Sequence, residues 1–394
     1  MERKMKDSGI PWIGKIPEHW EASKIGQLYD NRYVRVSDKD FEPLSVTMQG
    51  ILPQLETAAK TDDGDNRKLV RKGDFAINSR SDRRGSCGIS PQDGSVSLIN
   101  LILAPRTSMN ADYYNWLFHT TLFADEFYSW GHGIVADLWT TRWQEMKNIA
   151  IPVPPLAELE RIASYLDAKC GEIDELIEVE QQMISDLESY RQAVITEAVT
   201  HGLNPSENNT DSGVYWIGYV PSKWHIAKMK YFITITNGSD PKTEGDVPVY
   251  GSGASSFKTC GEFKEGPTVL IGRKGATLHI PHYIEGRYWN VDTAFDTRVN
   301  NFNLRYFYYL ASSLDYRAYI SATTLPSMTQ SNYENMLIPV PPLAEQQEIA
   351  EYLDTKCSEI DELIKVKQEK IETLKQYRQS LIFEAVTGKI RIDK

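Results

Sequence analysis

Two long stretches of the sequence repeat each other and decide the fold. Residues 151–200 begin IPVPPLAELERIASYLDAKCGEIDELI and end YRQAVITEAVT, and residues 338–387 begin IPVPPLAEQQEIAEYLDTKCSEIDELI and end YRQSLIFEAVT. Direct alignment makes 33 of these 50 pairs identical. A shorter repeat precedes each stretch, with SGIPWIGKIPEHW at 8–20 and SGVYWIGYVPSKW at 212–224. The 394-residue chain is therefore two tandem halves built on one frame.

Each long repeat predicts a helix. The Pro-Pro pairs at 154–155 and 341–342 stand where a helix start tolerates proline, and Gly202 and Gly388 follow the last residues. No proline interrupts either stretch between these limits. At about 1.5 Å per residue, ~44 residues span roughly 66 Å, which is longer than most globular helices. A coiled coil or a helical spacer is therefore expected.

The apolar spacing within the repeats predicts that the two helices pack together. Apolar residues alternate at intervals of three and four, as in a coiled-coil seam. The seam positions are Ile173, Ile177, Ile184, Leu187, Val194 and Ala198 in the first copy and Ile360, Ile364, Ile371, Leu374, Leu381 and Ala385 in the second. Charged residues interrupt both copies, at Glu180 and Arg191 and at Lys367 and Arg378. We expect an antiparallel pair about a pseudo-two-fold axis, and two unrelated surface helices are the alternative.

The regions between the repeats, about 21–150 and 225–337, do not resemble each other. Short strands are predicted at 73–78, 95–103 and 267–272, and short aromatic helices at 113–127 and 304–313. The fold class is α+β, with two mixed, strand-rich globular domains separated by the two helices. The predicted boundaries are 1–150 for the first domain with its W-I-G segment, 151–203 for the first helix, 204–337 for the second domain with its W-I-G segment, and 338–394 for the second helix and the C-terminus.

The acidity of the chain belongs to the predicted helices. The net charge is −11, but residues 156–201 hold 3 Lys/Arg against 11 Asp/Glu and residues 343–388 hold 6 against 10. The remaining residues are close to neutral, so local basic faces are compatible with the overall charge. The chain has no apolar run of 18 residues, no secretory signal and no paired CxxC cysteines, so a cytoplasmic protein is expected.

Motifs that would indicate catalysis are missing. The sequence has no Walker motif, no G-x-S-x-G elbow, no HExxH and no N/D-P-P-Y/F tetrapeptide of amino-methyltransferases. His279 and His282 alone stand near metal-ligand spacing, and a metal site there is disfavoured. The glycines at 251 and 253 lack the frame of a dinucleotide site and indicate a turn.

Basic loops after strands are the candidate binding residues. Arginine and lysine suit phosphates and guanine edges, and glycines allow close approach of the backbone. The candidates in the first domain are Asn78, Ser79, Arg80, Arg83, Arg84, Gly85, Thr141 and Arg142. Those in the second domain are Gly251, Ser252, Gly253, Arg273, Lys274, Thr324 and Ser327. The alternative is that these are ordinary solvated turns and caps, and Trp139, Trp143 and Trp289 are expected in the core.

The order, doubling and spacing of these motifs resemble a known family. The pattern is W-I-G-x-x-P-x-x-W, a variable insert, I-P-x-P-P-L-x-E-Q-x-x-I-A-x-Y-L-D and a long helix ending E-A-V-T-G, repeated twice. This arrangement resembles the specificity (S) subunit of type I restriction–modification systems. The resemblance covers nearly the whole chain. Leu159-Glu160 departs from the family pattern that Gln346-Gln347 follows.

The resemblance implies a non-catalytic subunit that reads a bipartite double-stranded DNA sequence. Each variable region would be a target recognition domain for one half-site, and the antiparallel helices would set the length of the unread spacer. Two methyltransferase subunits would dock, and two restriction subunits can join them. No cofactor is expected on this chain, because S-adenosylmethionine and ATP would bind the partners. A coiled-coil scaffold without DNA recognition, or an enzyme acting alone, are the alternatives.

Overall fold

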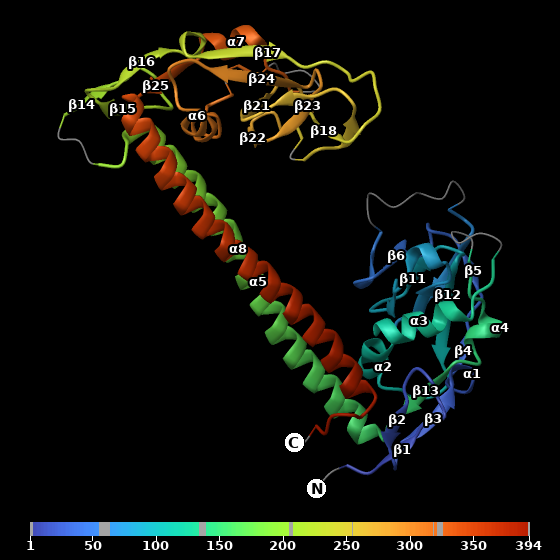
Figure 1. Ribbon diagram of the computed structural model, residues 1–394. Helices are drawn as coiled ribbons and strands as arrows, with labels where there is room; N and C mark the ends of the chain where they lie inside the picture. The colour runs from blue at the N-terminus through green and yellow to red at the C-terminus, as the bar shows by residue number, and fades with distance from the viewer. Residues whose placement is uncertain are drawn as a thin grey trace. The chain divides into compact units, whose positions relative to one another are not determined.

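The computed structural model (Figure 1) describes residues 3–54, 64–133, 139–204, 208–253, 255–317, 319–320 and 326–392. The chain divides into two compact units. Unit 1 comprises Met1–Glu180 with Glu369–Lys394, and unit 2 comprises Gln181–Gln368. Each unit therefore contains one variable insert together with one part of each long helix. None of the helices in the described part of the chain combines the length and apolar character that a membrane span requires.

Both repeats form the long helices that their sequences predict. Helix α5 is Leu156–His201 and helix α8 is Leu343–Val386. Each is followed by a glycine with a positive φ, 78° at Gly202 and 69° at Gly388. Only glycine adopts this left-handed conformation readily, so these residues end the helices.

In each unit the α5 and α8 segments run antiparallel and side by side (Figure 1). In unit 1 Arg378 Nε lies 3.0 Å from Asp174 Oδ1, and in unit 2 Arg191 Nε lies 3.2 Å from Asp361 Oδ1. These pairs are equivalent under the repeat, since 174 and 361, and 191 and 378, are matched positions. The antiparallel pairing expected from the seam is confirmed within each unit, and the arginines that interrupt the seam are joined to acids on the other helix.

Another residue that interrupts the seam, Glu180, is a buried acid. Glu180, only 4% exposed, accepts from Lys370 Nζ at 2.6 Å in unit 1. The matched contact in unit 2 joins Lys367 Nζ to Met183 Sδ at 3.3 Å. Glu180 thus accepts from a lysine three residues beyond Lys367, and Lys367 itself holds the position matched to Glu180 in the repeat. The two halves of the coiled coil differ in charge at this point.

Removing Lys370 should destabilise unit 1. Lys370→Met removes a hydrogen-bonded ammonium group from the buried Glu180 carboxylate, so we expect a loss of about 1–2 kcal/mol in the free energy of unfolding. Chemical denaturation measures it, and Glu180→Leu combined with Lys370→Met should recover most of the loss. Lys356→Met is the control, because the Lys356–Glu359 pair is solvent-exposed and its loss should barely change stability. Equal effects of the two lysine variants would contradict a role for burial.

Unit 1 is built on a four-stranded antiparallel sheet of order β10-β9-β12-β4. Smaller sheets β11-β8-β5, β6-β7, β13-β3 and β1-β2 surround it. The elements are β1 Met5–Asp7, β2 Lys15–Pro17, β3 Glu21–Lys24, α1 Ile25–Leu28, β4 Tyr29–Asn31, β5 Arg35–Val36, β6 Leu44–Thr47, β7 Gly50–Pro53, β8 Arg67–Val70, β9 Phe75–Asn78, η1 Ser81–Arg83, β10 Cys87–Ile89, β11 Gly94–Val96, β12 Asn100–Pro105, α2 Ala111–Phe118, α3 Thr121–Ser129, α4 Trp143–Met146 and β13 Ala150–Val153.

Unit 2 contains a sheet of order β17-β24-β21-β22 and a second of order β19-β18-β23-β20, with the pairs β16-β25 and β14-β15. Its elements are β14 Asn209–Asp211, β15 Tyr219–Pro221, β16 His225–Lys228, η3 Met229–Tyr231, β17 Ile233–Asn237, β18 Val247–Tyr250, β19 Lys258–Cys260, β20 Lys264–Glu265, β21 Thr268–Gly272, β22 His282–Ile284, β23 Arg287–Asn290, β24 Ala294–Val299, α6 Leu304–Ala311, α7 Gln330–Asn335 and β25 Leu337–Val340.

The main sheets of the two inserts have the same design although their sequences do not resemble each other. Reading β10-β9-β12-β4 against β22-β21-β24-β17 matches each strand in order. The register matches as well: Asn78 pairs with Asn100 in unit 1, and Gly272 pairs with Ala294 in unit 2. Both members of each pair are displaced by 194 residues. The prediction of two mixed, strand-rich domains is confirmed.

Two predicted elements of unit 1 were wrong in their extent. The expected strand 95–103 is two strands, β11 and β12, because the chain turns at 97–99, where Asn100 N donates to Ser97 O at 3.1 Å. The expected helix 113–127 is α2 and α3. Thr120 separates them because its side chain accepts from Phe123 N and caps the second helix.

An aromatic helix attaches each insert to the long helices within its unit. Tyr113 Oη of α2 donates to Val386 O at 2.7 Å, and Tyr306 Oη of α6 donates to Val199 O at 3.1 Å. All four residues are buried. The capping asparagines Asn110 and Asn303 each stand three residues before the tyrosine and accept from its backbone N–H. The core of each unit therefore continues from the insert into the coiled coil.

Candidate nucleic-acid interface

A basic loop follows the matched central strand of each unit. Strand β9 ends at Asn78, and the first basic loop, residues 79–85, follows it. Strand β21 ends at Gly272, and the second basic loop, residues 273–276, follows it. Every residue of both strands is buried, so the charged side chains begin where the chain leaves the sheet.

In unit 1 the first basic loop is held from both sides by backbone contacts. Ser79 N donates to Ile99 O at 3.3 Å, and Thr141 N donates to Ser79 O at 3.0 Å. Arg80 then forms an isolated antiparallel bridge with Thr140. The segments around 80 and 140, which the sequence indicated separately, therefore lie together.

The second basic loop is held in the same way. Arg273 N donates to Thr293 O at 2.8 Å, and Met328 N donates to Arg273 O at 2.9 Å. Lys274 forms an isolated antiparallel bridge with Ser327. Each contact is the counterpart of one in unit 1, so Arg80 and Lys274 occupy equivalent positions in two inserts of unrelated sequence.

The candidates of the first domain divide into exposed cations and buried polar groups. Arg80, Arg83, Arg84 and Arg142 are exposed, whereas Asn78, Ser79 and Thr141 are buried. The buried side chains have internal partners: Asn78 Oδ1 accepts from Arg80 N, Ser79 Oγ donates to Ile99 O, and Thr141 Oγ1 donates to Phe127 O. Gly85, at φ 77°, takes the left-handed conformation that turns the chain back toward β10.

The first basic loop is not free of acids. Arg84 forms an ion pair with Asp125 of α3, and its guanidinium lies 5.8 Å from the centre of the Tyr128 ring. Arg83 Nε lies 3.8 Å from Asp82 Oδ2. Arg80 has no such acidic partner within the described residues.

The glycine-rich segment of the second domain packs against the second basic loop. Ser252 Oγ donates to Lys274 O, and Thr277 Oγ1 donates to Ser252 O at 2.6 Å. A Cβ on Gly275, whose φ is 122°, would lie 2.8 Å from Ser252 Oγ, so this close approach needs glycine. Gly253 is exposed as expected, but Gly251 is buried, because it packs near Thr293 rather than facing solvent. Thr324 lies outside the described residues.

Two buried tyrosines fix the strand ends that carry the loops, and sequence reasoning missed both. Tyr128 Oη donates to Asn78 O at 3.1 Å, and Tyr333 Oη donates to Gly272 O at 2.7 Å. Burial raises the pKa of both phenols, which keeps them protonated as donors. They come from helices α3 and α7, at positions that the sequence repeat does not relate, so alignment of the halves could not find them.

The tyrosine on the second strand end can be tested directly. Tyr333→Phe leaves the buried Gly272 carbonyl without this donor, and we expect a loss of about 1–3 kcal/mol in the free energy of unfolding of unit 2. Thermal and chemical denaturation measure it. Tyr319→Phe is the control, because this tyrosine is 36% exposed, and it should change stability by under ~0.5 kcal/mol. A Tyr333→Phe chain as stable as the control would contradict the assigned role.

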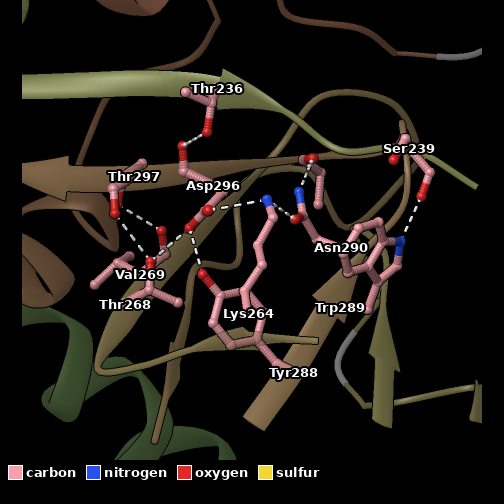
Figure 2. Close-up of polar contacts among 11 residues, drawn as sticks. Thr236, Ser239, Lys264, Thr268, Val269, Tyr288, Trp289, Asn290, Asp296 and Thr297 are labelled. Carbon is pink, nitrogen blue, oxygen red and sulfur yellow. Dashed lines mark hydrogen bonds and ion pairs between the residues drawn. The ribbon is translucent and has the colours of Figure 1, made fainter. Parts of the chain in front are cut away.

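A buried polar network joins strands β20, β21, β23 and β24 of unit 2 (Figure 2). Lys264 Nζ donates to Asn290 Oδ1 at 2.7 Å and to Asp296 Oδ2 at 3.0 Å. The other carboxylate oxygen of Asp296 accepts from Thr268 Oγ1 at 2.8 Å and from Tyr288 Oη at 2.9 Å. The acid is only 4% exposed, and its lysine and hydrogen bonds compensate its burial.

The described residues contain no group of three or more His, Cys, Asp or Glu side chains arranged to hold a metal ion. His282 is partly buried, and burial lowers the pKa of its imidazole. Both basic loops place guanidinium and ammonium donors on a fixed backbone, and such donors suit phosphates and base edges.

The sequence is similar to a known family model and to known proteins. Residues 221–373 match the family model described as "Type I restriction modification DNA specificity domain". The chain is 22% identical to the putative type I restriction enzyme MjaX specificity subunit of Methanocaldococcus jannaschii, over 96% of both chains. It is 23% identical to the MjaVIII specificity subunit of the same organism, over 96% of this chain and 94% of the relative.

Solved structures share the fold. One is a chain from a structure titled "Structural basis underlying complex assembly and conformational transition of the type I R-M system". It superposes with a TM-score of 0.74 at 17% identity, over 95% of this chain and 99% of its own length. The HsdS subunit from Thermoanaerobacter tengcongensis gives a TM-score of 0.53 at 19% identity, over 95% and 98%. The chain therefore shares the fold of these two solved chains. In sequence and in fold, this chain is similar to type I restriction–modification specificity subunits.

Proposed function

We propose that this chain selects the DNA target of a type I restriction–modification complex, with each insert acting as a target recognition domain for one half-site. The observation that carries the proposal is the matched pair of basic loops. Two inserts of unrelated sequence present a cation at equivalent positions, Arg80 and Lys274, on the same backbone platform. Two different half-sites require different side chains at the position that contacts the bases. Here a shared backbone arrangement holds Arg80 in one insert and Lys274 in the other.

The proposal gives the candidate residues two kinds of role. The exposed cations Arg80, Arg83, Arg84 and Arg142 would contact DNA from the first domain, and Arg273 and Lys274 from the second. Contacts to phosphates would position the subunit, while contacts to base edges would supply discrimination. Asn78, Ser79 and Thr141 would hold the first loop in place, because their polar atoms have internal partners.

In this role the chain contributes recognition and its partners contribute catalysis. Methyltransferase subunits would bind S-adenosylmethionine and methylate adenine N6, and restriction subunits would use ATP. The cytoplasm is where such a complex meets the cell's DNA. No chemical step is assigned to this chain.

Twin apolar patches on the helices support docking of two copies of one partner. Leu176 and Val179 on α5 are 47% and 53% exposed, and their repeat counterparts Leu363 and Val366 on α8 are both 51% exposed. Residues three apart share a helix face, so each pair forms a small apolar surface. The same surface occurs once in each unit, which fits two methyltransferase subunits per chain.

Disrupting one patch should remove one partner. Leu176→Glu with Val179→Glu places two charges in an apolar contact, and we expect the complex to retain one methyltransferase subunit instead of two, measured by native mass spectrometry. The Leu363→Glu, Val366→Glu variant should behave alike, and the variant with all four changes should bind none. Both sites are exposed, so circular dichroism should be unchanged. Retention of two partners by all three variants would refute docking at these patches.

The methylation map of the host genome tests the proposed function. Adenine methylation is sequenced with and without the gene, and one bipartite motif should lose methylation on deletion and regain it on complementation. The two half-sites and the spacer can then be read directly from the map. An unchanged map, combined with a purified complex that binds all sequences equally, would favour the scaffold alternative.

A further inference from the structure

The second basic loop has an acidic neighbour at a position where the first has an apolar residue. The displacement of 194 residues matches Leu98 in unit 1 to Asp292 in unit 2. Asp292 Oδ2 lies 3.5 Å from Lys274 Nζ and 3.9 Å from Arg273 Nη1. The backbone carbonyl of Asp292 also accepts from Arg273 Nη1 at 3.2 Å. One residue therefore contacts both cations assigned to the second half-site.

The turn that carries Asp292 is fixed by backbone hydrogen bonds. Val291 N donates to Tyr250 O at 3.0 Å, and Ala294 N donates to Val291 O at 3.1 Å. The next residue, Thr293, accepts from the backbone N–H groups of both Arg273 and Lys274. The turn and the second basic loop are thus held together independently of their side chains.

One residue of the buried network in Figure 2 also makes a hydrogen bond across this turn. Asn290, which is fully buried, spans the turn because its Nδ2 donates to Ala294 O at 2.9 Å, while its Oδ1 accepts from Lys264. The position in unit 1 that matches Asp296 is Ile102, which is buried and apolar. The polar support is therefore specific to the second insert and is not part of the shared frame.

A carboxylate between two cations on a DNA-facing surface has opposing effects. It orients the cations through charge-assisted contacts, and it repels phosphate. The Asp292 side chain is 50% exposed, so DNA approaching the loop would meet its charge. The carboxylate therefore lowers the affinity of binding that depends only on phosphate contacts. It strengthens contacts to base edges, because it fixes the orientation of Arg273 and Lys274.

We propose that Asp292 is a positioning residue for specificity at the second half-site: it directs Arg273 and Lys274 toward bases and penalises sequence-independent contact with phosphate. This inference rests on the proposed function. It adds a residue that motif reasoning did not select, because an aspartate in a short turn has no signal of its own in the sequence.

The test uses the complete complex of this chain with its methyltransferase subunits. Asp292→Asn removes the charge and keeps the shape, and we expect affinity for a duplex lacking the target to rise about five-fold. The methylation map should lose base preference at the second half-site and keep it at the first. Asp292→Glu should retain discrimination. Asp315→Asn is the matched control, because Asp315 pairs with Arg317 on the surface of the same unit, and it should change neither readout.

The outcomes separate this inference from the proposed function. A folded Asp292→Asn complex with wild-type affinity and wild-type preference at both half-sites overturns the role of Asp292 and leaves the proposed function standing. Loss of preference at both half-sites also overturns it, because a positioning role is confined to the second domain. If the wild-type complex itself shows no sequence preference, the proposed function fails, and this inference fails with it.

Discussion

Replacing Arg273 and Lys274 by alanine should abolish recognition of one half-site and leave the other intact. The two cations stand on one backbone platform beside the turn at 290–294, and each base contact by such a side chain contributes about 1–3 kcal/mol of discrimination. Losing both should reduce affinity for the target duplex by roughly two to three orders of magnitude at fixed salt. Methylation of the native motif should disappear from the genome map.

The matched variant in the first domain is Arg80→Ala, because Arg80 is the equivalent of Lys274. It should weaken preference at the other half-site only. Arg317→Ala serves as the control, since this exposed arginine is paired with Asp315 and takes no part in either loop. Titrations at several salt concentrations separate the two kinds of contact: a cation that binds phosphate lowers the slope of affinity against salt by about one when removed. Wild-type methylation in the Arg273→Ala, Lys274→Ala strain would contradict the proposal that this loop contacts the second half-site.

The long helices could be predicted from the sequence because their signals are local. Proline pairs, closing glycines and the three-four spacing of apolar residues fix the limits of α5 and α8 to within a few residues. The antiparallel pairing followed from the doubling of one seam. The partner of Glu180 did not, because the seam shows which residues face inward but not which residue of the other helix is opposite.

The inserts could be predicted only in outline. Their sheets match strand for strand at a displacement of 194, but a buried strand position accepts many side chains, so Ala76 and Leu270 hold the same place without sequence similarity. The basic loops were visible because charges after an apolar strand stand out. Tyr128, Tyr333 and Asp292 were not, since each acts through a contact with residues far away in the chain.

Shortening both long helices should change the spacing of the DNA target. Removing residues 180–186 from α5 and 367–373 from α8 takes one heptad from each helix and keeps Val179 and Val366. Both segments lie between the contact of Asp174 with Arg378 and that of Arg191 with Asp361. One heptad is about 10 Å of helix, equivalent to roughly three base pairs. If the helices set the unread spacer, methylation at the native spacing should fall at least ten-fold, and any new motif should keep both half-sites with a shorter spacer.

The deletion needs a control that keeps the length of both helices and alters their exposed surface. Because a heptad preserves the seam, circular dichroism should report a folded coiled coil in the shortened chain. Replacing the exposed positions Glu178, Gln182 and Glu369 with alanine in the full-length chain should leave spacer length unchanged. A shortened subunit that still directs methylation to the native spacing would show that the half-site separation is set elsewhere. A shorter spacer with unchanged half-sites would assign base reading to the inserts and spacing to the helices, as separate properties of one chain.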